Sequence, residues 1–339
     1  MSALESEITL PAWLAKAIAD IGLDAALDLT EMVTRPYTGQ WFRDELKGLC
    51  AGANLGASCY RTAVRMHMLA GLTQGHCSLF GAWGSATALN HTLQLRALDW
   101  NMDGPFVDYP AITVYHGDGG VTNNTFAMVG FVSFIGALTG VSDQQVGISE
   151  IGVSYPGNDG NYGTQSRIGL PFIVLLREIL QFDKTIDDAI TRMANAKRTC
   201  DLILAVGDGK EGFARSFLYS GSQLIVEDDF APKPVNNTWH FPLPQMVYHG
   251  MDYMCPGYTE VLGLQLQKHH GQLTGELAVQ DVISVVGSGD VHVAIYDLTI
   301  QQMWVSFAAP HNTSKSLPLT AYARQFAQFD LATLFAETM

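Results

Sequence analysis

The spacing of hydrophobic residues changes at Cys77, and this change limits the possible folds more than any other feature. Over 12–32, 38–50 and 59–72, apolar side chains recur every three or four residues, which predicts amphipathic helices. From Cys77 to Val153 the chain breaks into short runs of β-branched and aromatic residues between Gly, Asn and Asp turns, which predicts strands. A helical segment followed by a stack of strands indicates an α+β protein.

The rest of the chain mixes both kinds of element. Residues 201–228 predict strands joined by a turn of the Asp-Gly type at Gly207-Asp208-Gly209, which is too short for a phosphate-binding loop. The other predicted elements are two helices within 166–196, the second beginning near Thr185, a helix over 258–270, a hairpin over 291–308 and a helix over 321–337. No internal repeat or linker divides the chain, so we expect sheets covered by helices.

Composition excludes several classes of partner. The 19 Lys and Arg face 33 Asp and Glu, and the net charge of -14 repels phosphate backbones and anionic lipids. The N-terminus lacks a basic region followed by an apolar run, and no stretch is apolar enough to cross a bilayer. We therefore expect a soluble, cytoplasmic protein that binds neither nucleic acid nor a membrane.

The cysteines and histidines do not have the spacing of a metal site or a disulfide framework. The five cysteines are an odd number without a C-x-x-C pair. His269 and His270 are adjacent on an expected helix, so they point to different sides. We expect no disulfide, no metal and no cofactor, and most of the thiols as small buried apolar groups.

Cys77 differs from the other cysteines because it lies where helix changes to strand. One expected strand later, Arg96 and Asp99 interrupt an apolar run, and buried charges are costly unless they are paired or used. A hairpin would bring both side chains beside Cys77. Alternatively, Cys77 is a buried structural residue and the two charges belong to an exposed edge strand.

These residues resemble those of a known family. The Cys-Ser at a strand start, the R-x-x-D-W segment and the run GALTGVSDQQVGISEIGV at 136–153 resemble the acyl-coenzyme A:6-aminopenicillanic acid acyltransferase-like (peptidase C45) family. That family belongs to the N-terminal-nucleophile (Ntn) hydrolases and is related to choloylglycine hydrolases. The resemblance spans about residues 40–310. It implies a four-layer αββα sandwich, with a helical pro-segment or small subunit at 1–76 and the core at 77–339.

The resemblance also implies a mechanism. The Cys77 side chain attacks the carbonyl of His76, and the chain is cut between these two residues. The freed α-amino group has an intrinsic pKa near 8, so it can accept the thiol proton and serve as general base. Asp99 matches the aspartate that orients this amine, and Arg96 matches the arginine that lowers the thiol pKa. Tyr155 falls where the family lines its pocket and holds the oxyanion.

The remaining site residues are assigned more loosely. Trp100 and Asn101 are expected at the mouth of the pocket, and Glu150 is either a pocket residue or a paired structural acid. Where the family has a T-N-H segment, whose Asn binds the oxyanion, this chain has Met246 to Asp252. His249, Tyr248 or backbone N–H groups are expected to replace that Asn, and losing such a donor can cost about a hundredfold in rate.

We expect an autoprocessing cysteine amidohydrolase that acts on a linear, non-peptide N-acyl amide. An acyltransferase that passes the acyl group to an amine is the alternative, as is an unprocessed relative that only binds acylated ligands. A papain-like protease fits less well, since the sequence around Cys77 lacks that family's pattern. A homo-oligomer could form through the N-terminal helices.

Overall fold

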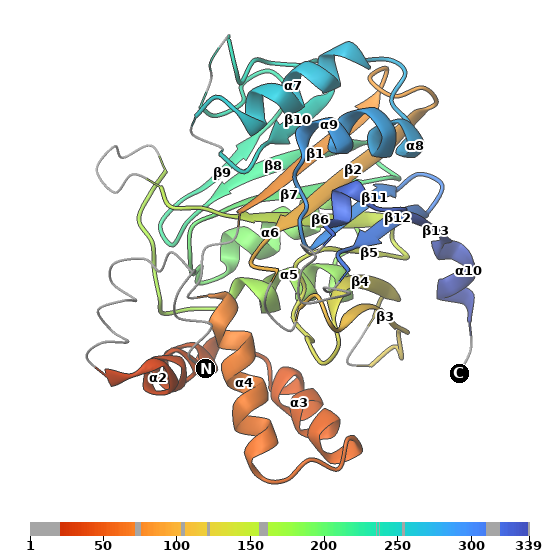
Figure 1. Ribbon diagram of the computed structural model, residues 1–339. Coiled ribbons are helices and arrows are strands. Elements are labelled where there is room, and N and C mark those ends of the chain that lie inside the picture. Colours follow the sequence, from red (N-terminus) through yellow and green to blue (C-terminus); the bar gives the residue numbers. More distant parts are fainter. Residues whose placement is uncertain are drawn as a thin grey trace.

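A computed structural model describes residues 21–71, 76–102, 106–120, 123–155, 162–234, 236, 238–252, 255–309 and 319–337. Two antiparallel sheets face each other, and helices cover the outer face of each (Figure 1). The predicted α+β class and the αββα layering are confirmed. The expected helix over 12–32 lies partly outside the described residues.

The strand that begins at His76, where the chain changes from helix to strand, is an inner strand of the first sheet. Its strand order is β10-β1-β2-β11-β12-β13, and every neighbouring pair is antiparallel. The strands are β1 (His76–Gly84), β2 (Asn90–Asp99), β10 (Met246–His249), β11 (His292–Asp297), β12 (Gln302–Phe307) and β13 (Ala327–Asp330). The strands predicted after Cys77 and over 291–308 are thus confirmed.

The second sheet follows the chain order β3 to β9 and is also antiparallel. Its strands are β3 (Pro110–Tyr115), β4 (Phe126–Phe131), β5 (Gly140–Ser142), β6 (Val146–Gly152), β7 (Leu202–Asp208), β8 (Phe213–Tyr219) and β9 (Leu224–Glu227). Strand β5 has only three residues and pairs with β6 only at Gly147 and Ile148, so residues 149–152 of β6 have no partner on β5.

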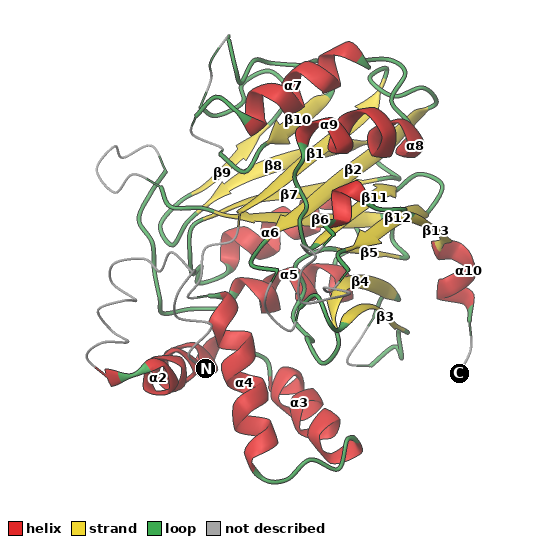
Figure 2. Cartoon of the chain, in the orientation of Figure 1, coloured by secondary structure: helices red, strands yellow, loops and turns green. Residues whose placement is uncertain are grey.

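Each sheet separates two apolar layers because side chains alternate along a strand. On β2, Leu93, Leu95 and Ala97 pack against the outer helices, while Leu98 lies between the sheets. The outer layer of the first sheet contains α7 (Tyr258–Lys268), α8 (Gly275–Leu277), the π-helix η2 (Ala278–Ile283) and α9 (Ser284–Val286) (Figure 2). Helices α5 (Phe172–Phe182) and α6 (Ile186–Asn195) cover the second sheet, and Thr185 caps α6 as predicted.

The N-terminal segment packs on the α5 side of the second sheet. It consists of α2 (Leu23–Thr34), the 3-10 helix η1 (Arg35–Tyr37), α3 (Gln40–Gly52) and α4 (Ser58–Ala70). Buried Arg177 on α5 bonds Glu45 on α3 at 2.9 Å and stacks on the Tyr115 ring at 3.9 Å. His67 on α4 accepts the Ile135 backbone N–H at 2.9 Å. These buried polar contacts fix the segment on the core.

Replacing Glu45 by glutamine is expected to lower the free energy of unfolding by about 1.5 kcal/mol, because it removes the charged partner of buried Arg177. Urea denaturation measures the change. Asp44→Asn on the same helix is the control, since the Asp44–Lys47 pair is exposed and solvent screens it. Equal losses in both variants would mean that Glu45 does not anchor α3.

One cysteine prediction is wrong. Cys50, near the end of α3, and Cys59, in the first turn of α4, form a disulfide with a Cα–Cα distance of 5.8 Å. The sequence gives no sign of it because only the turn between the two helices brings the thiols together. Cys77 and Cys200 are free and buried, as expected, whereas free Cys255 is exposed.

The predicted C-terminal helix over 321–337 is also wrong. The 3-10 turn η3 (Ala321–Ala323) comes first, then edge strand β13 pairs with β12, and only α10 (Leu331–Ala336) is helical. The Asp330 side chain accepts the Thr333 N–H and starts α10 at that point. Pairing with β12 therefore prevails over the helical spacing of this segment.

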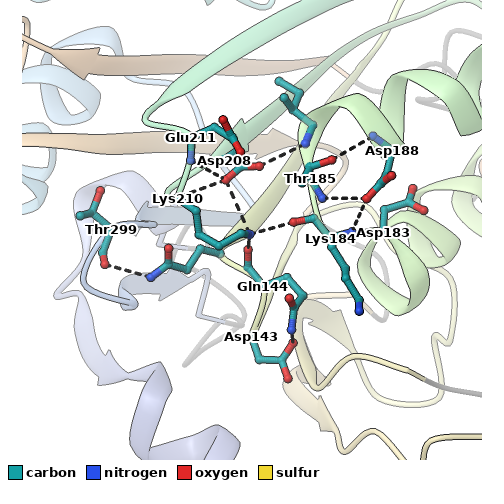
Figure 3. Close-up of polar contacts among 12 residues, drawn as sticks. Asp143, Gln144, Asp183, Lys184, Thr185, Asp188, Asp208, Lys210, Glu211 and Thr299 are labelled. Carbon is teal, nitrogen blue, oxygen red and sulfur yellow. Dashed lines mark hydrogen bonds and ion pairs between the residues drawn. The ribbon is translucent and has the colours of Figure 1, made fainter.

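The Asp-Gly turn after β7 is confirmed as a hairpin turn, and Asp208 organises it (Figure 3). One Asp208 oxygen accepts the backbone N–H groups of Lys210 and Glu211, and the other accepts the N–H of Ile186 at the start of α6. The Lys210 ammonium donates to the backbone carbonyls of Gln144 and Lys184. The lysine thus ties the turn to the neighbouring loops.

Candidate active site

Cys77 is the second residue of β1, and its neighbours come from the paired strand β2. Cys77 lies opposite Leu98, His76 opposite Asp99, and Leu79 opposite Arg96. The expected hairpin between Cys77 and the Arg96–Asp99 segment is therefore confirmed. His76 is exposed, whereas Cys77 has no exposed surface. The His76–Cys77 peptide bond thus lies where the chain passes from the surface into the interior.

The Arg96 guanidinium reaches the Cys77 thiol from between the sheets. Its Nη2 donates to Cys77 Sγ at 3.2 Å and to Glu150 Oε1 at 2.5 Å. Its Nε donates to the Glu150 backbone carbonyl at 3.3 Å. Strand β5 pairs with β6 only at Gly147 and Ile148, so Glu150 lies beyond that pairing. Arg96 thus crosses from β2 of the first sheet to Glu150 on β6 of the second.

Burial determines the protonation of the thiol in this uncut chain. Loss of solvent raises the pKa of Cys77 to about 12, and the Arg96 charge opposes this rise while Glu150 and Asp99 add to it. Burial also raises the pKa of the Glu150 carboxyl, against the effect of Arg96. The thiol is thus protonated at neutral pH. A group within the site must accept its proton before the sulfur can act as a nucleophile.

Asp99 is the last residue of β2 and lies opposite His76, beside the His76–Cys77 peptide bond. One carboxyl oxygen accepts the backbone N–H groups of Gly289 and Asp290 at 2.7 and 3.0 Å, and the other accepts the Ser288 hydroxyl at 2.5 Å. Burial raises the pKa of Asp99 to about 6, although these three donors favour the charged form. Asp99 is thus held in one orientation and is charged at neutral pH.

A cavity of about 350 Å³ opens next to this group. Its lining includes Leu98, the partner of Cys77, and Glu150, the partner of Arg96. Trp100 and Phe131 form further parts of the wall, and residues of α4, such as Met66, close another side. The lining is mainly apolar, so the cavity suits an apolar ligand, and it reaches the reactive group through Leu98 and Glu150, since Cys77, Arg96 and Asp99 are not among the described lining residues.

The other predicted site residues differ in whether they line the cavity or pack near Cys77. Trp100 lines the cavity, as expected, while Asn101 is partly exposed and is not among the described lining residues. Tyr155 belongs to the same apolar cluster as Cys77, but its hydroxyl donates to the Leu202 carbonyl at 2.7 Å and its ring stacks on Tyr162.

The two residues expected to replace the oxyanion asparagine face opposite ways on β10. Tyr248 points to the outer helices, where its hydroxyl bonds the backbone of Phe241, so the structure does not bring it to Cys77. His249 lies opposite Leu79 and bonds Glu227 at 2.9 Å. His249 is thus engaged with β9.

Two residues of this site were not predicted. His292 bonds Arg96 Nη1 through its Nε2 at 3.0 Å, and Ser288 holds Asp99. Asp297 faces the opposite side of β11 from His292, because side chains alternate along a strand, and it bonds His91. Ser288 and His292 come from a segment about 190 residues after Asp99, so no local pattern could have indicated them.

Neither a metal cluster nor a membrane-spanning helix occurs in the described ranges. No group of three or more His, Cys, Asp or Glu residues there has the arrangement of a metal site. No helix in the same ranges is both long and apolar enough to cross a membrane.

Two curated proteins are similar to this chain over nearly its whole length, whereas no protein-family model matches it. Protein dcd1A of Dictyostelium discoideum is 36% identical to this chain over an alignment of 347 positions. The alignment covers 96% of this chain and 74% of dcd1A. Protein dcd1B of the same organism is 35% identical over an alignment of 342 positions, which covers 97% of this chain and 65% of dcd1B.

Among solved structures, similarity is low in both sequence and superposition. A Caenorhabditis elegans ortholog of N-acylethanolamine-hydrolyzing acid amidase has 13% identity and a TM-score of 0.48, covering 66% of this chain and 93% of its own. Penicillin V acylase from Agrobacterium tumefaciens has 15% identity and a TM-score of 0.45, covering 75% and 92%. A mutant of the conjugated bile acid hydrolase from Clostridium perfringens has 11% identity and a TM-score of 0.47, covering 76% and 93%.

Proposed function

Because this chain belongs to the family of the Dictyostelium discoideum proteins dcd1A and dcd1B, whose names state no activity, we propose its function from its own site. We propose that it is a cysteine amidohydrolase of the N-terminal-nucleophile type, which cuts itself between His76 and Cys77 and then hydrolyses N-acyl compounds. One observation carries the proposal: Arg96 donates to the Cys77 thiol at 3.2 Å, while Asp99 lies opposite His76 at the bond to be cut.

The cleavage step uses only the chain and one water molecule. The Cys77 sulfur attacks the His76 carbonyl carbon, the C–N bond breaks, and the thiol proton passes to the departing nitrogen. Water then hydrolyses the resulting thioester, which leaves a carboxylate on His76 and a free α-amino group on Cys77. The position of this bond supports the step, since His76 is exposed and open to water while the sulfur is buried.

Turnover of a substrate repeats this chemistry with an external acyl group. The new α-amino group, with an ordinary pKa near 8, accepts the thiol proton that burial otherwise retains. Asp99 orients the amine and balances its charge, and Arg96 stabilises the thiolate. The acyl group occupies the apolar cavity, the amine leaves with a proton, and water releases the acid.

The cavity also supports a second candidate, which is acyl transfer. Its mainly apolar lining disfavours water near the acyl-enzyme, so an amine that binds there could compete as acceptor. The two reactions share every step up to the acyl-enzyme, and product analysis with an added amine distinguishes them.

The disulfide changes the expected location. A bond such as Cys50–Cys59 persists in oxidising compartments and is rare in the cytosol. We therefore place the protein in an oxidising compartment in preference to the cytoplasm. Thiol counting on protein isolated under alkylating conditions tests this, since cytoplasmic protein would carry both thiols free.

The test of the proposed function is a denaturing intact-mass spectrum of the purified chain, before and after incubation with a panel of N-acyl amides. We expect two fragments, one ending at His76 and one beginning at Cys77, and an acyl adduct on the second fragment after a rapid acid quench. A single uncut chain that carries no adduct and releases no acid would overturn the proposal.

Replacing Glu150 by glutamine is expected to lower the apparent pKa of the Cys77 thiol by about one unit, since the Glu150 charge raises it. The acid limb of the kcat/KM profile then moves to lower pH, because the thiolate persists further into acid. The pH profile of the cut protein measures the shift. Glu178→Gln, which removes a half-buried carboxylate paired with Arg192, is the control and leaves the limb in place. A shift to higher pH would contradict this assignment.

A further inference from the structure

His292 is a buried residue of β11 that the proposed chemistry does not use. It is the first residue of that strand, pairs with Leu98 on β2, and has no exposed surface. Its ring lies between the rings of Phe131 and Phe307, with centroid distances of 6.1 and 6.0 Å. Burying a polar ring is costly, and Nδ1 has no hydrogen-bond partner among the described residues, so Nε2 carries the polar contacts of the ring.

The Arg96 contact determines which nitrogen carries the proton. A guanidinium has only donors, so His292 Nε2, at 3.0 Å from Arg96 Nη1, must accept and the ring proton lies on Nδ1. The Thr139 hydroxyl, 3.1 Å from the same nitrogen, then donates to it as well. Burial and the Arg96 charge both keep the pKa of His292 well below its usual range, so the ring stays neutral. His292 is thus a permanent acceptor for Arg96.

The acceptors around Arg96 lie along different edges of its planar head. Nε and Nη2 face the Glu150 carbonyl and carboxylate, and Nη1 faces His292. The thiol of Cys77 shares Nη2 with Glu150. Without an acceptor at Nη1, the plane could turn toward the stronger partner, the Glu150 carboxylate, and Nη2 would leave the sulfur.

We propose that His292 is the positioning residue that keeps Arg96 Nη2 directed at the Cys77 sulfur. This inference rests on the proposed function, since it takes Cys77 as the nucleophile. The charged and titratable groups of this site are Arg96, Glu150, Asp99, Cys77 itself and Tyr296, which burial keeps protonated, together with the new amine after cleavage. Among these groups, His292 acts on the thiol only through Arg96.

Two substitutions separate positioning from packing. His292→Phe keeps an aromatic ring between Phe131 and Phe307 but removes the acceptor. His292→Gln loses the ring but places its Oε1 near the former position of Nε2, so it can still accept from Arg96. Tyr296→Phe is the matched control, because Tyr296 is buried on the same face of β11 and its hydroxyl has no partner among the described residues.

The experiment measures the rate at which iodoacetamide alkylates Cys77 in the cut protein between pH 5 and 9. Peptide mass spectrometry separates Cys77 from Cys200 and Cys255, and kcat/KM is followed over the same range. For His292→Phe we expect the thiol pKa to rise by about one unit, which gives about tenfold slower alkylation on the acid side. His292→Gln and Tyr296→Phe stay within about threefold of the wild type.

Three results would overturn the inference. A His292→Phe protein that folds and keeps the wild-type pH profile shows that Arg96 needs no acceptor there. Equal losses in the Phe and Gln variants, with unchanged profiles, show that His292 only packs. A wild-type chain that is never cut at Cys77 overturns the proposed function first, and the inference with it.

Discussion

A chain with Cys77→Ala is expected to remain a single uncut molecule and to release no acid from any N-acyl amide that the wild type hydrolyses. The substitution removes the sulfur that Arg96 bonds at 3.2 Å, and no other thiol of the described residues bonds Arg96. Alanine fits the buried position and leaves the pairing with Leu98 intact, so we expect a folded protein. Intact mass and an acid-release assay measure the two losses.

The control for this result is Cys255→Ala, which removes the exposed free thiol. This variant is expected to be cut and to hydrolyse amides like the wild type. If Cys77→Ala is still cut after His76, another protease makes the cut. If it also keeps its hydrolytic activity, the nucleophile lies elsewhere.

Asp99→Asn is expected to lower kcat/KM about a thousandfold while changing thermal stability little. The asparagine oxygen can still accept the Gly289 and Asp290 N–H groups, and the Ser288 hydroxyl can turn to accept from the amide nitrogen. What disappears is the negative charge that, in the proposed function, orients and balances the Cys77 amine. General-base catalysis contributes about 10²- to 10⁴-fold, so this loss is large.

The matched control for Asp99→Asn is Asp297→Asn. Asp297 is a buried carboxylate in the same sheet, but it bonds His91 at the other end of β11. We expect its kcat/KM to stay within about threefold of the wild type. A similar loss of activity in both variants, together with lowered melting temperatures, would show that buried carboxylates in this sheet serve stability and not the reaction.

Much of the site follows from local sequence. The change of period at Cys77 predicts a strand start, and a hairpin of the observed length places Arg96 and Asp99 beside it, as the register confirms. Helix α6 was predicted from its capping residue and acidic first turn, and both lie in the structure as expected. Each of these features depends on residues within about 20 positions of one another, so the spacing of residues along the sequence indicates it.

The errors come from contacts between distant segments. The Cys50–Cys59 disulfide depends on the angle between two helices, and β13 replaces a helix because β12 offers it an edge. Tyr248 was expected near Cys77, but alternation along β10 turns it to the outer helices. The free energy of contacts between distant segments cannot be read from the spacing of residues along the sequence.

The sequence alone determined the strand that carries Cys77 and the charged pair that follows it, because backbone propensity and side-chain alternation act locally. The tertiary structure alone decided what surrounds the thiol. Glu150 on β6 pairs with Arg96 from the facing sheet, Ser288 and the backbone after it hold Asp99, and His292 arrives on β11 from the far end of the chain. Burial, which retains the thiol proton, exists only once these segments have packed.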